Sequence, residues 1–291
     1  MNKLRIVTYN IDGLPDKLNL GDIPWCLKPI AWVYKKIKGT TEIVINDNPN
    51  RAENMRQIGE YLKSLNADII AVQEDFNYHD ELMSGLGVDY IGTTHTGDIS
   101  LKNLFSKTEW RPFPRFKADG LNLIVNTDTT CTFSEDIVRW KKSNGYVGHA
   151  NDKLTHKGFR HYVTSVGDNS PLIDLYIVHM DADFYNPETC PDVSKDVKAR
   201  RSQIQQLLEY IQKNDISNPT IIIGDTNSTD RYEWDRENIQ LLKDAGFTEA
   251  KAQDNDVDRF FYKGNIKVLN AEYDDVWLSD HKPLIVDIEL A

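Results

Sequence analysis

Short apolar runs alternate along the chain with longer amphipathic stretches, and this pattern predicts most of the secondary structure. A run of apolar or β-branched residues bounded by Gly, Pro, Asn or Asp is typical of a buried strand. Such runs predict strands at 4–9, 67–72, 120–125, 172–178, 220–223, 257–262 and 284–290. Apolar positions at helical spacing predict helices at 50–65, 192–212 and 234–245. Strands and helices in this mixed order indicate an α/β fold.

The helix predicted at 50–65 has the clearest signals. Asn50 suits the N-cap position, and Glu53 three residues later makes a variant of the capping box. The expected buried face consists of Met55, Ile58, Leu62 and Leu65. Because the strand at 67–72 follows almost at once, Glu74 should arrive at the carboxyl end of that strand.

The stretch 220–230 (TIIIGDTNSTD) joins a buried strand to side chains of metal-ligand type. Asp225 and Asn227 follow the strand directly, on either side of Thr226. In extended backbone this alternation would point both side chains the same way. Reactive groups collect where strands end and loops begin. Similar residues follow or flank other strands, namely Asn10, Asp12, Glu74, His179, Asp258, Asp280 and His281.

Composition narrows the classes of protein that the sequence fits. The chain has 291 residues, 40% of them hydrophobic, and no Pro/Gly/Ser-rich linker divides it, so we expect one domain over 1–291. A net charge of −11 argues against tight, non-specific binding to long nucleic acid, although it leaves room for a nuclease with a local basic groove. An acidic chain also suits a site that gathers cations.

Cysteine content and hydropathy bear on the cellular compartment. The three cysteines, Cys26, Cys131 and Cys190, are too few and too scattered for a disulfide framework or a zinc site. The longest apolar runs fall short of the ~18 residues that a membrane span needs. No signal-peptide pattern follows Met1. We therefore expect a soluble protein that is either intracellular or secreted with a leader that this sequence lacks.

The polar residues at the strand ends indicate metal-assisted hydrolysis of a phosphoester. Carboxylates and amides without thiolates suit a hard divalent cation, above all Mg²⁺, with Mn²⁺ or another divalent cation as alternatives. Hydrolysis also needs an activated water, which a histidine oriented by a carboxylate can supply. Asp280 and His281 have this composition, and Asp258 is a candidate for orienting His281. Dinucleotide-binding, P-loop, α/β-hydrolase and common zinc-protease motifs are absent.

Three basic stretches have both a functional and a plain structural interpretation. The segment 23–38 has aromatics beside four lysines and no acid, which suits a lipid surface or a helix that packs its aromatics inward. The segment 111–117 offers a basic-aromatic groove for nucleic acid, or a solvated loop. Lys157 beside Gly158 can bring a cation to a phosphate, or mark a hairpin turn.

Taken together and in order, these motifs resemble the endonuclease/exonuclease/phosphatase superfamily, which includes DNase I-like nucleases, abasic-site endonucleases, inositol-phosphate phosphatases and neutral sphingomyelinases. The matching stretches run from end to end: TYNIDGL (8–14), DIIAVQE (68–74), IVHMDAD (177–183), IIIGDTN (221–227), VDRFF (257–261) and SDHKPL (279–284). The resemblance implies a four-layer α/β (α+β) sandwich, with two stacked mixed sheets between helices. It also implies Mg²⁺ dependence and a site at the strand ends.

The resemblance assigns four of the matching residues to the metal. Glu74 corresponds to the principal metal ligand, and Asn10 lies beside it in the family's pattern. Asp280 corresponds to a carboxylate on the metal side or the phosphate side of the site. Asp12, in a motif close to that of the abasic-site endonucleases, corresponds to a ligand of a second metal site.

The other matching residues correspond to catalytic groups. Asp225 and Asn227 match the pair that positions the attacking water and the phosphate. His281 matches the general base, and Asp258 matches the acid that orients it. His179 matches a second histidine on the phosphate, a position where abasic-site endonucleases usually carry Tyr.

The stretch DKLTHKGFRHYV (152–163) favours the sphingomyelinase branch, because it resembles the Lys-Gly loop in which a lysine approaches the lipid phosphate. Lys157 would then bind substrate in an enzyme that hydrolyses a phospholipid head group. We further expect a monomer with peripheral membrane contact through 23–38. A nuclease acting on DNA is the alternative enzyme, and a catalytically inactive binding module is the alternative of another class.

Overall fold

Two six-stranded mixed sheets stack at the centre of the computed structural model, which describes residues 2–22, 28–45, 50–101, 116–145, 152–167, 170–214, 217–252 and 256–290. In spatial order, the first sheet contains β13 (Ile266–Tyr273), β14 (Leu284–Leu290), β1 (Asn2–Asn10), β4 (Ile69–Gln73), β6 (Asn122–Asn126) and β5 (Tyr90–Gly92). The second contains β11 (Thr248–Glu249), β12 (Asp258–Lys263), β10 (Thr220–Asp225), β9 (Ile173–His179), β8 (Gly158–Val166) and β7 (Thr130–Arg139).

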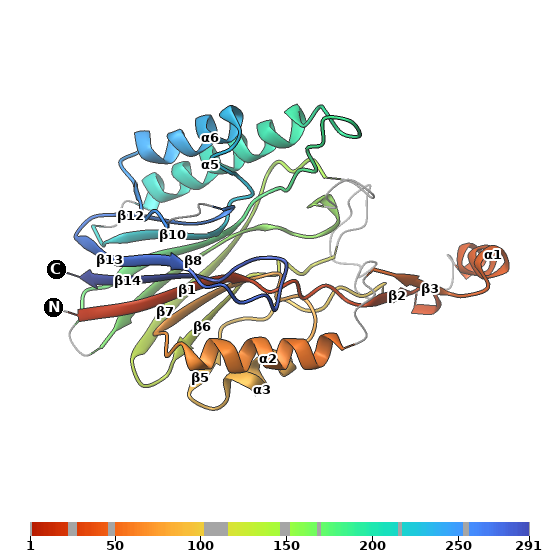
Figure 1. Ribbon diagram of the computed structural model, residues 1–291, viewed down its shortest axis with the longest axis horizontal. Coiled ribbons are helices and arrows are strands. Elements are labelled where there is room, and N and C mark those ends of the chain that lie inside the picture. Colours follow the sequence, from red (N-terminus) through yellow and green to blue (C-terminus); the bar gives the residue numbers. More distant parts are fainter. Residues whose placement is uncertain are drawn as a thin grey trace.

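Helices cover the outer face of each sheet (Figure 1). The first sheet is covered by α2 (Arg51–Ser64) and α3 (His79–Leu86), and the second by α5 (Ser194–Asn214) and α6 (Glu233–Asp244). These layers confirm the predicted four-layer sandwich of two mixed sheets between helices.

Three hydrophobic cores separate the four layers. Successive residues of a strand point to opposite faces, so Ile6 packs between the sheets whereas Val7 packs toward α2. In the second sheet, Ile221 packs between the sheets and Ile222 packs toward α5 and α6. Because both faces are covered, β4 and β10 are buried along their whole length, which explains their continuous apolar runs.

Two central parallel strand pairs bring four strand ends to one end of the sandwich, which we call the site end. β1 pairs in parallel with β4, with Asn10 opposite Gln73. β9 pairs in parallel with β10, with His179 opposite Asp225. β12 runs antiparallel to β10 and therefore begins at the site end, where Asp258 lies opposite Asp225. Polar residues far apart in the sequence thus collect at this end.

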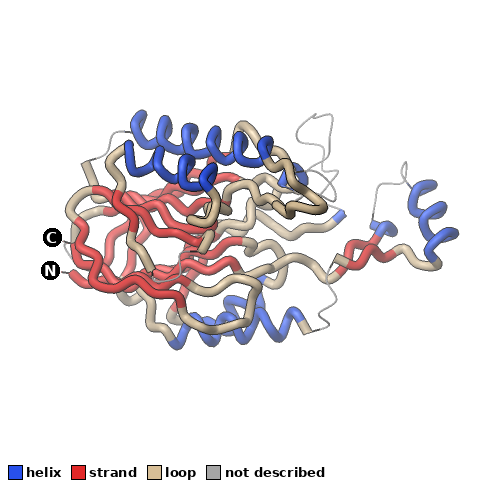
Figure 2. The backbone as a smooth tube through the Cα atoms, turned by 45° about the horizontal axis from the view of Figure 1, so that its top comes forward, coloured by secondary structure: helices blue, strands red, loops and turns tan. Residues whose placement is uncertain are grey.

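An arm projects from the site end, away from both sheets (Figures 1 and 2). It consists of β2 (Lys17–Asn19), η1 (Leu20–Asp22), α1 (Lys28–Lys38) and β3 (Glu42–Val44), and β2 pairs with β3. Trp32 in α1 is 63% exposed, so the interpretation in which this helix packs its aromatics inward is wrong for Trp32. Residues 23–27, with Trp25, lie outside the described residues. None of the described helices has the length and hydrophobicity to span a bilayer.

The predicted elements occur with small shifts, apart from one detail of α2. Asn50 occupies the N-cap position, but its side chain makes no capping hydrogen bond. The reason is its backbone, at φ −117° and ψ 28°, whereas a capping residue normally adopts extended angles. The pattern did not predict α3, the β2–β3 ribbon or the strands β5, β7, β8, β11 and β13.

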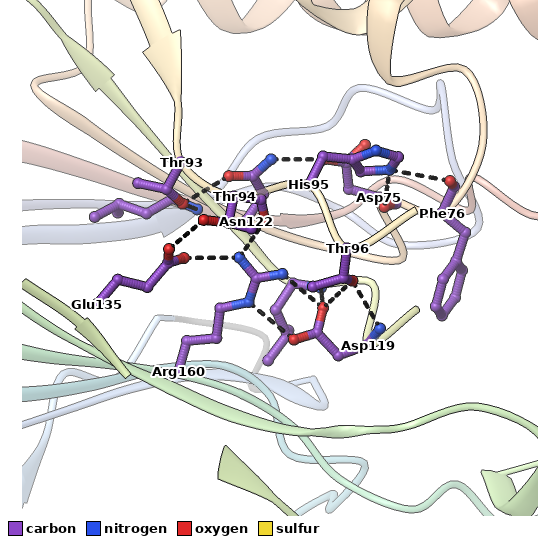
Figure 3. A network of polar contacts seen from close by, with 12 residues as sticks. Asp75, Phe76, Thr93, Thr94, His95, Thr96, Asp119, Asn122, Glu135 and Arg160 are labelled. Carbon is purple, nitrogen blue, oxygen red and sulfur yellow. Dashed lines mark hydrogen bonds and ion pairs between the residues drawn. The ribbon is translucent and has the colours of Figure 1, made fainter. Parts of the chain in front are cut away.

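A buried network around Arg160 on β8 joins the two sheets (Figure 3). Arg160 donates from Nε and Nη2 to both oxygens of Asp119, at 2.9 and 2.7 Å. Its Nη1 donates to Glu135 Oε1 at 2.9 Å and to the carbonyl oxygen of Thr94 at 2.6 Å. Asp119 precedes β6, so these bonds link the second sheet to the first.

Replacing Arg160 with Met should lower the free energy of unfolding by about 3–5 kcal/mol, because the buried Asp119 carboxylate would lose its partner. Urea denaturation of both proteins measures the difference. Arg56→Met is the matched control, since Arg56 also pairs with two acids, Glu53 and Glu60, but on the exposed face of α2. Equal effects of the two substitutions would contradict a supporting role for the buried network.

Candidate active site

The first sheet contributes Asn10 and Glu74, and the loops that follow β1 and β4 are joined by backbone hydrogen bonds. Gly13 N donates to the carbonyl oxygen of Glu74 at 3.0 Å. A Cβ on Gly13 would lie 2.3 Å from that oxygen, so only glycine allows this approach. Glu74 itself adopts a positive φ of 60°, which is uncommon for a residue with a side chain. The backbone thus holds Glu74 at the end of β4 beside the loop that follows Asn10.

Asp75, the residue after Glu74, is held in place by side-chain contacts with Asn122 and His79. Asn122 Nδ2 donates to Asp75 Oδ2 at 2.9 Å, and His79 Nδ1 lies 2.8 Å from the same oxygen. His95 stacks on His79 with ring centres 4.4 Å apart and planes within 9°. Ligand atoms of Asp75, His79 and His95 lie within 4.8 Å of one another. His95 Nε2 in turn lies 3.1 Å from the carbonyl oxygens of Asp75 and Phe76, so with His79 on Asp75 the two rings support the loop that follows Glu74.

Asp225 Oδ2 is the meeting point of the two sheets. Asn10 Nδ2 donates to it at 3.2 Å across the interface between the sheets. His179 Nε2 lies 3.5 Å from the same oxygen and 3.9 Å from Glu74 Oε1. His281 Nε2 lies 3.9 Å from Asp225 Oδ2 as well. Two carboxylates and two imidazoles therefore converge on one small volume.

His281 is held by Asp258 in the orientation that the sequence predicts. His281 Nδ1 lies 2.5 Å from Asp258 Oδ2, and Asp258 is almost fully buried. His281 reaches this position because it precedes β14, which runs antiparallel to β1 and so begins at the site end. With Nδ1 directed at the acid, Nε2 faces Asp225.

Asn227 corrects the geometric argument made from the sequence. The strand ends at Asp225, and Asn227 has a left-handed φ of 47° in place of extended backbone. Asp225 Oδ1 accepts a hydrogen bond from Asn227 N at 2.8 Å, which forms the turn. The Asn227 amide donates to the carbonyl oxygen of Met180 at 3.0 Å. Asn227 is thus placed by a turn that ties the β10 loop to the β9 loop.

Lys157 is buried in the site and does not sit in a hairpin turn. It lies directly before β8, and its Nζ lies 2.6 Å from Asp152 Oδ1. Asp152 also accepts a hydrogen bond from Ala182 N at 3.1 Å, which ties it to the loop after His179. Burial lowers the pKa of Lys157, but Asp152 and then Glu74 outweigh burial, so the net shift is upward. The lysine is therefore a buried cation directed at the carboxylates.

Asp12 and Asp280 lie at the rim of the site. Arg51 of α2 forms an ion pair with Asp12 and also donates to its carbonyl oxygen. Asp280 Oδ1 accepts a hydrogen bond from Ser279 Oγ at 3.1 Å. Asp12, Arg51, Ser279 and Asp280 line one hollow together. The charge of Asp12 is thus paired with that of Arg51, and Asp280 is the more exposed of the two acids.

Burial and neighbouring charges shift the pKa values of one acid, Glu74, and two histidines, His179 and His281, in the site. Burial raises the pKa of Glu74 to about 7, against the opposing effect of Lys157. Burial lowers the pKa of His179 well below its usual value, with Lys157 and His281 adding to the effect, so this imidazole is neutral. Burial also lowers the pKa of His281, but Asp258 and Asp225 outweigh burial and raise it overall. A cation bound between Glu74 and Asp225 would be stabilised by the negative charge of these carboxylates.

The donor set fits a hard divalent cation. Glu74, Asp225 and the Asn10 amide supply oxygens, and ligand atoms of Asp225, Asp258 and His281 lie within 4.8 Å of one another. Asp258 Oδ1 is buried and forms no hydrogen bond within the described part of the chain. Oxygen-rich sites with one or two carboxylates suit Mg²⁺. Of the four predicted metal ligands, Asn10 and Glu74 lie in the group around Asp225 and His179, whereas Asp12 and Asp280 lie at the rim.

Three supporting residues were not predicted from the sequence. Ser279 Oγ donates to the carbonyl oxygen of Asn10 at 2.7 Å and thereby joins the loop before β14 to β1. Asp152 pairs with Lys157, and Arg51 pairs with Asp12. Asp152 lies within the stretch that suggested a phosphate-binding lysine, so a search for acids near that lysine would have found it. Arg51 and Ser279 carry no comparable signal.

A family model described as the endonuclease/exonuclease/phosphatase family matches residues 7–281, which is most of the chain. The chain belongs to this family. Members of the family are typically metal-dependent phosphoesterases. The match ends at His281, so it spans every predicted site residue. A comparison with curated proteins found no match.

Solved structures of the same fold resemble the chain along nearly its whole length. Beta toxin from Staphylococcus aureus is 16% identical, with a TM-score of 0.63 over 97% of this chain and 99% of that one. A beta toxin mutant with bound magnesium ions is 15% identical, with a TM-score of 0.61 over 98% and 99%. The human Nocturnin catalytic domain with bound sulfate is 15% identical, with a TM-score of 0.56 over 99% and 95%. At these identities the likeness shows the fold alone.

Proposed function

We propose that the protein is a Mg²⁺-dependent phosphodiesterase that releases the head group of a phospholipid, in the manner of a sphingomyelinase C. The observation that carries the proposal is the convergence of two sheets on Asp225. Asn10 and Glu74 come from one sheet, and His179 and the His281–Asp258 pair come to the same point. Mn²⁺ or another divalent cation is compatible with the same oxygen donors.

Water activation falls to His281. Burial lowers the pKa of His281, but the carboxylates of Asp258 and Asp225 raise it overall, and the charge of a divalent cation beside Asp225 would offset their effect and favour the neutral ring. In the neutral imidazole, Nδ1–H donates a hydrogen bond to Asp258, and the lone pair of Nε2 faces Asp225. A water between His281 Nε2 and Asp225 Oδ2 would be aligned by the carboxylate and deprotonated by the imidazole. Asp258 then stabilises the imidazolium, so the pair acts as an oriented general base.

Phosphate binding falls to Lys157, His179 and Asn227. The water oxygen forms a bond to phosphorus, its proton passes to His281, and the bond from phosphorus to the lipid oxygen breaks. The lipid oxygen leaves as an alkoxide and takes a proton from solvent water to become an alcohol, His281 returns its proton to solvent, and the phosphate stays on the head group. When bound by Glu74 and Asn10, with Asp280 and Asp12 near the rim, a divalent cation would neutralise phosphate charge and stabilise the leaving oxygen.

Lipid is favoured over nucleic acid as substrate by two features. Lys157 is a buried cation directed at Glu74 and so suits one phosphate, whereas a long polyanion needs a row of cations along the surface. Of the basic-aromatic groove predicted at 111–117, residues 111–115 lie outside the described residues. Phe116 is 5% exposed and so is not available to stack on a base.

Head-group release tests the proposal and separates it from its alternatives. Purified protein with Mg²⁺ should release phosphocholine from sphingomyelin vesicles, or the phosphorylated head group of another phospholipid. Cleavage of plasmid or abasic DNA without turnover of any phospholipid would instead establish the nuclease. No turnover of either substrate and no calorimetric binding at millimolar Mg²⁺ would establish the inactive binding module.

Replacing Lys157 with Met should lower kcat/KM for a phosphodiester by roughly 10–150-fold, because a charged hydrogen bond to phosphate is lost. Lys153→Met is the matched control, since Lys153 is exposed in the same segment. The double variant Lys157→Met/Asp152→Asn removes the acid that the single variant leaves unpaired. If the double variant recovers wild-type kcat/KM, Lys157 does not bind the phosphate.

A further inference from the structure

We propose that the arm formed by β2, η1, α1 and β3 is a membrane-docking element that binds an anionic lipid bilayer. The proposal deepens the proposed function, since a phospholipid hydrolase must reach head groups that lie in a membrane. Binding itself requires no turnover, so the docking can be tested separately from the chemistry.

One side of α1 exposes apolar side chains that nothing in the described structure covers. Trp32 is 63% exposed, Val33 47% and Ile37 73%. At ~100° per residue these side chains span about 140° of the helix circumference, with Lys36 between Trp32 and Val33, whereas Ala31 is buried. Val44 and Ile45, at the end of β3, are also exposed and extend the apolar surface of the arm. Isolated exposed hydrophobics are ordinary, but a cluster on a projecting element marks a binding surface.

The charge of α1 is opposite to that of the chain. The helix carries Lys28, Lys35, Lys36 and Lys38 and no acid, in a protein of net charge −11. Lys36 Nζ lies 5.0 Å above the ring of Trp32, so cation and aromatic ring share one face. Lysines that flank an apolar face match the interface of an anionic bilayer, where the stems lie along the lipid and the ammonium groups reach the phosphates.

The aliphatic residues decide between a membrane and a nucleic acid. Single-stranded nucleic acid is bound by aromatic side chains that stack on bases and by cations along the backbone. The branched side chains of Val33 and Ile37 cannot stack and would remain exposed in such a complex. A bilayer would bury them together with Trp32. The mixture on α1 therefore fits lipid.

The root of the arm is tied directly to the catalytic loops. Arg51 donates to the carbonyl oxygens of Asp12 and Leu14, between Asn10 and the start of β2. Gly13 in the same segment donates to the carbonyl oxygen of Glu74. The arm leaves the sandwich at the site end (Figure 1), where β4 ends before Glu74 and β10 ends at Asp225, so a bilayer bound to α1 would face that end.

Vesicle co-sedimentation in the presence of EDTA tests the docking without turnover. Wild-type protein should bind phosphatidylcholine vesicles that contain phosphatidylglycerol more tightly than vesicles of phosphatidylcholine alone. The variant Trp32→Ala/Ile37→Ala should lower the partition coefficient at least about tenfold. The variant Lys35→Gln/Lys38→Gln should lower it by about fivefold per lysine on the anionic vesicles.

Matched substitutions outside the arm provide the controls. Phe133 on β7 is 64% exposed, like Trp32, and Lys267 on β13 is an exposed lysine, so Phe133→Ala and Lys267→Gln should leave binding unchanged. Turnover of a soluble diester, bis(p-nitrophenyl) phosphate, should be equal in all these proteins. Vesicle binding that is absent, or that falls equally in the arm and control variants, overturns the docking. So does arm-dependent binding of single-stranded DNA without binding of vesicles.

The docking and the proposed function can fail independently. Vesicle binding that depends on the arm, without hydrolysis of any phospholipid, would support the docking and contradict the sphingomyelinase-like chemistry. Hydrolysis of vesicle lipid at a rate that the arm variants do not change would support the chemistry and overturn the docking.

Discussion

Replacing His281 with Ala should lower kcat for a phosphodiester by about 10²–10⁴-fold, the contribution expected of a general base. His281 has the buried carboxylate of Asp258 on Nδ1 while its Nε2 faces Asp225, so it is placed to take a proton from a water at Asp225. Removing the ring leaves the water beside Asp225 without a proton acceptor. Steady-state kinetics at saturating Mg²⁺ measures the loss.

A second His–Asp pair in the same sheet supplies the control. His161 Nε2 lies 2.5 Å from Asp174 Oδ1, a contact of the same length and type as that of His281 with Asp258. Asp174 lies on β9, toward the opposite end of the strand from His179. His161→Ala should cost stability but leave kcat per folded molecule unchanged. If His281→Ala retains wild-type kcat, His281 is not the base.

Asp258→Asn separates orientation from proton transfer. The amide keeps the size of the side chain but removes the charge that stabilises the imidazolium. We expect kcat to fall by less than in His281→Ala, with the loss greatest for the water-activation step. An Asp258→Asn enzyme with wild-type kcat would exclude an orienting role for this acid.

Chelation of the divalent cation should remove turnover, and Glu74→Gln should raise the Mg²⁺ concentration for half-maximal rate by at least about 100-fold. That shift exceeds the 10–100-fold typical of residues that only support a ligand. Glu74 is a partly buried carboxylate beside His179, and burial raises its pKa to about 7 against the opposing effect of Lys157. Calorimetric titration with Mg²⁺ and the Mg²⁺ dependence of kcat should give the same shift.

Glu60→Gln is the control for this metal dependence. Glu60 lies on the exposed face of α2, where it pairs with Arg56. Its removal should leave both the affinity for Mg²⁺ and the rate unchanged. Wild-type Mg²⁺ dependence in Glu74→Gln would mean that the ligands lie elsewhere, and turnover that survives chelation would exclude metal-assisted hydrolysis altogether.

The central strands could be predicted because burial on both faces leaves a strong local signal. β4 and β10 are continuous apolar runs with polar residues directly after them. Strands at the sheet edges carry a weaker signal. β7 alternates buried, exposed and intermediate positions, and its sequence TCTFSEDIVR has no apolar run. The pattern therefore predicted the central strands except β8, whose sequence GFRHYVTSV mixes polar and apolar residues, and it missed the edge strands β5, β7, β11 and β13.

The residue types of the site could be predicted, but part of their geometry could not. Asn227 was expected to lie in extended backbone, whereas a turn closed on Asp225 gives it a positive φ. The pairing of Lys157 with Asp152 depends on the loop after His179, which lies more than twenty residues further along the chain. Such contacts have no periodicity that a single sequence could reveal.

The sequence by itself determined which strands end in ligand-type side chains and the order in which they follow one another. It also determined that α1 is a basic, aromatic segment in an acidic chain. Only the tertiary structure decided that Asn10 meets Asp225, that Asp258 faces His281, and that α1 projects from the site end with Trp32 exposed. The physical reason is that strand sequences record burial, whereas contacts between sheets depend on how two twisted sheets stack and on where their loops cross.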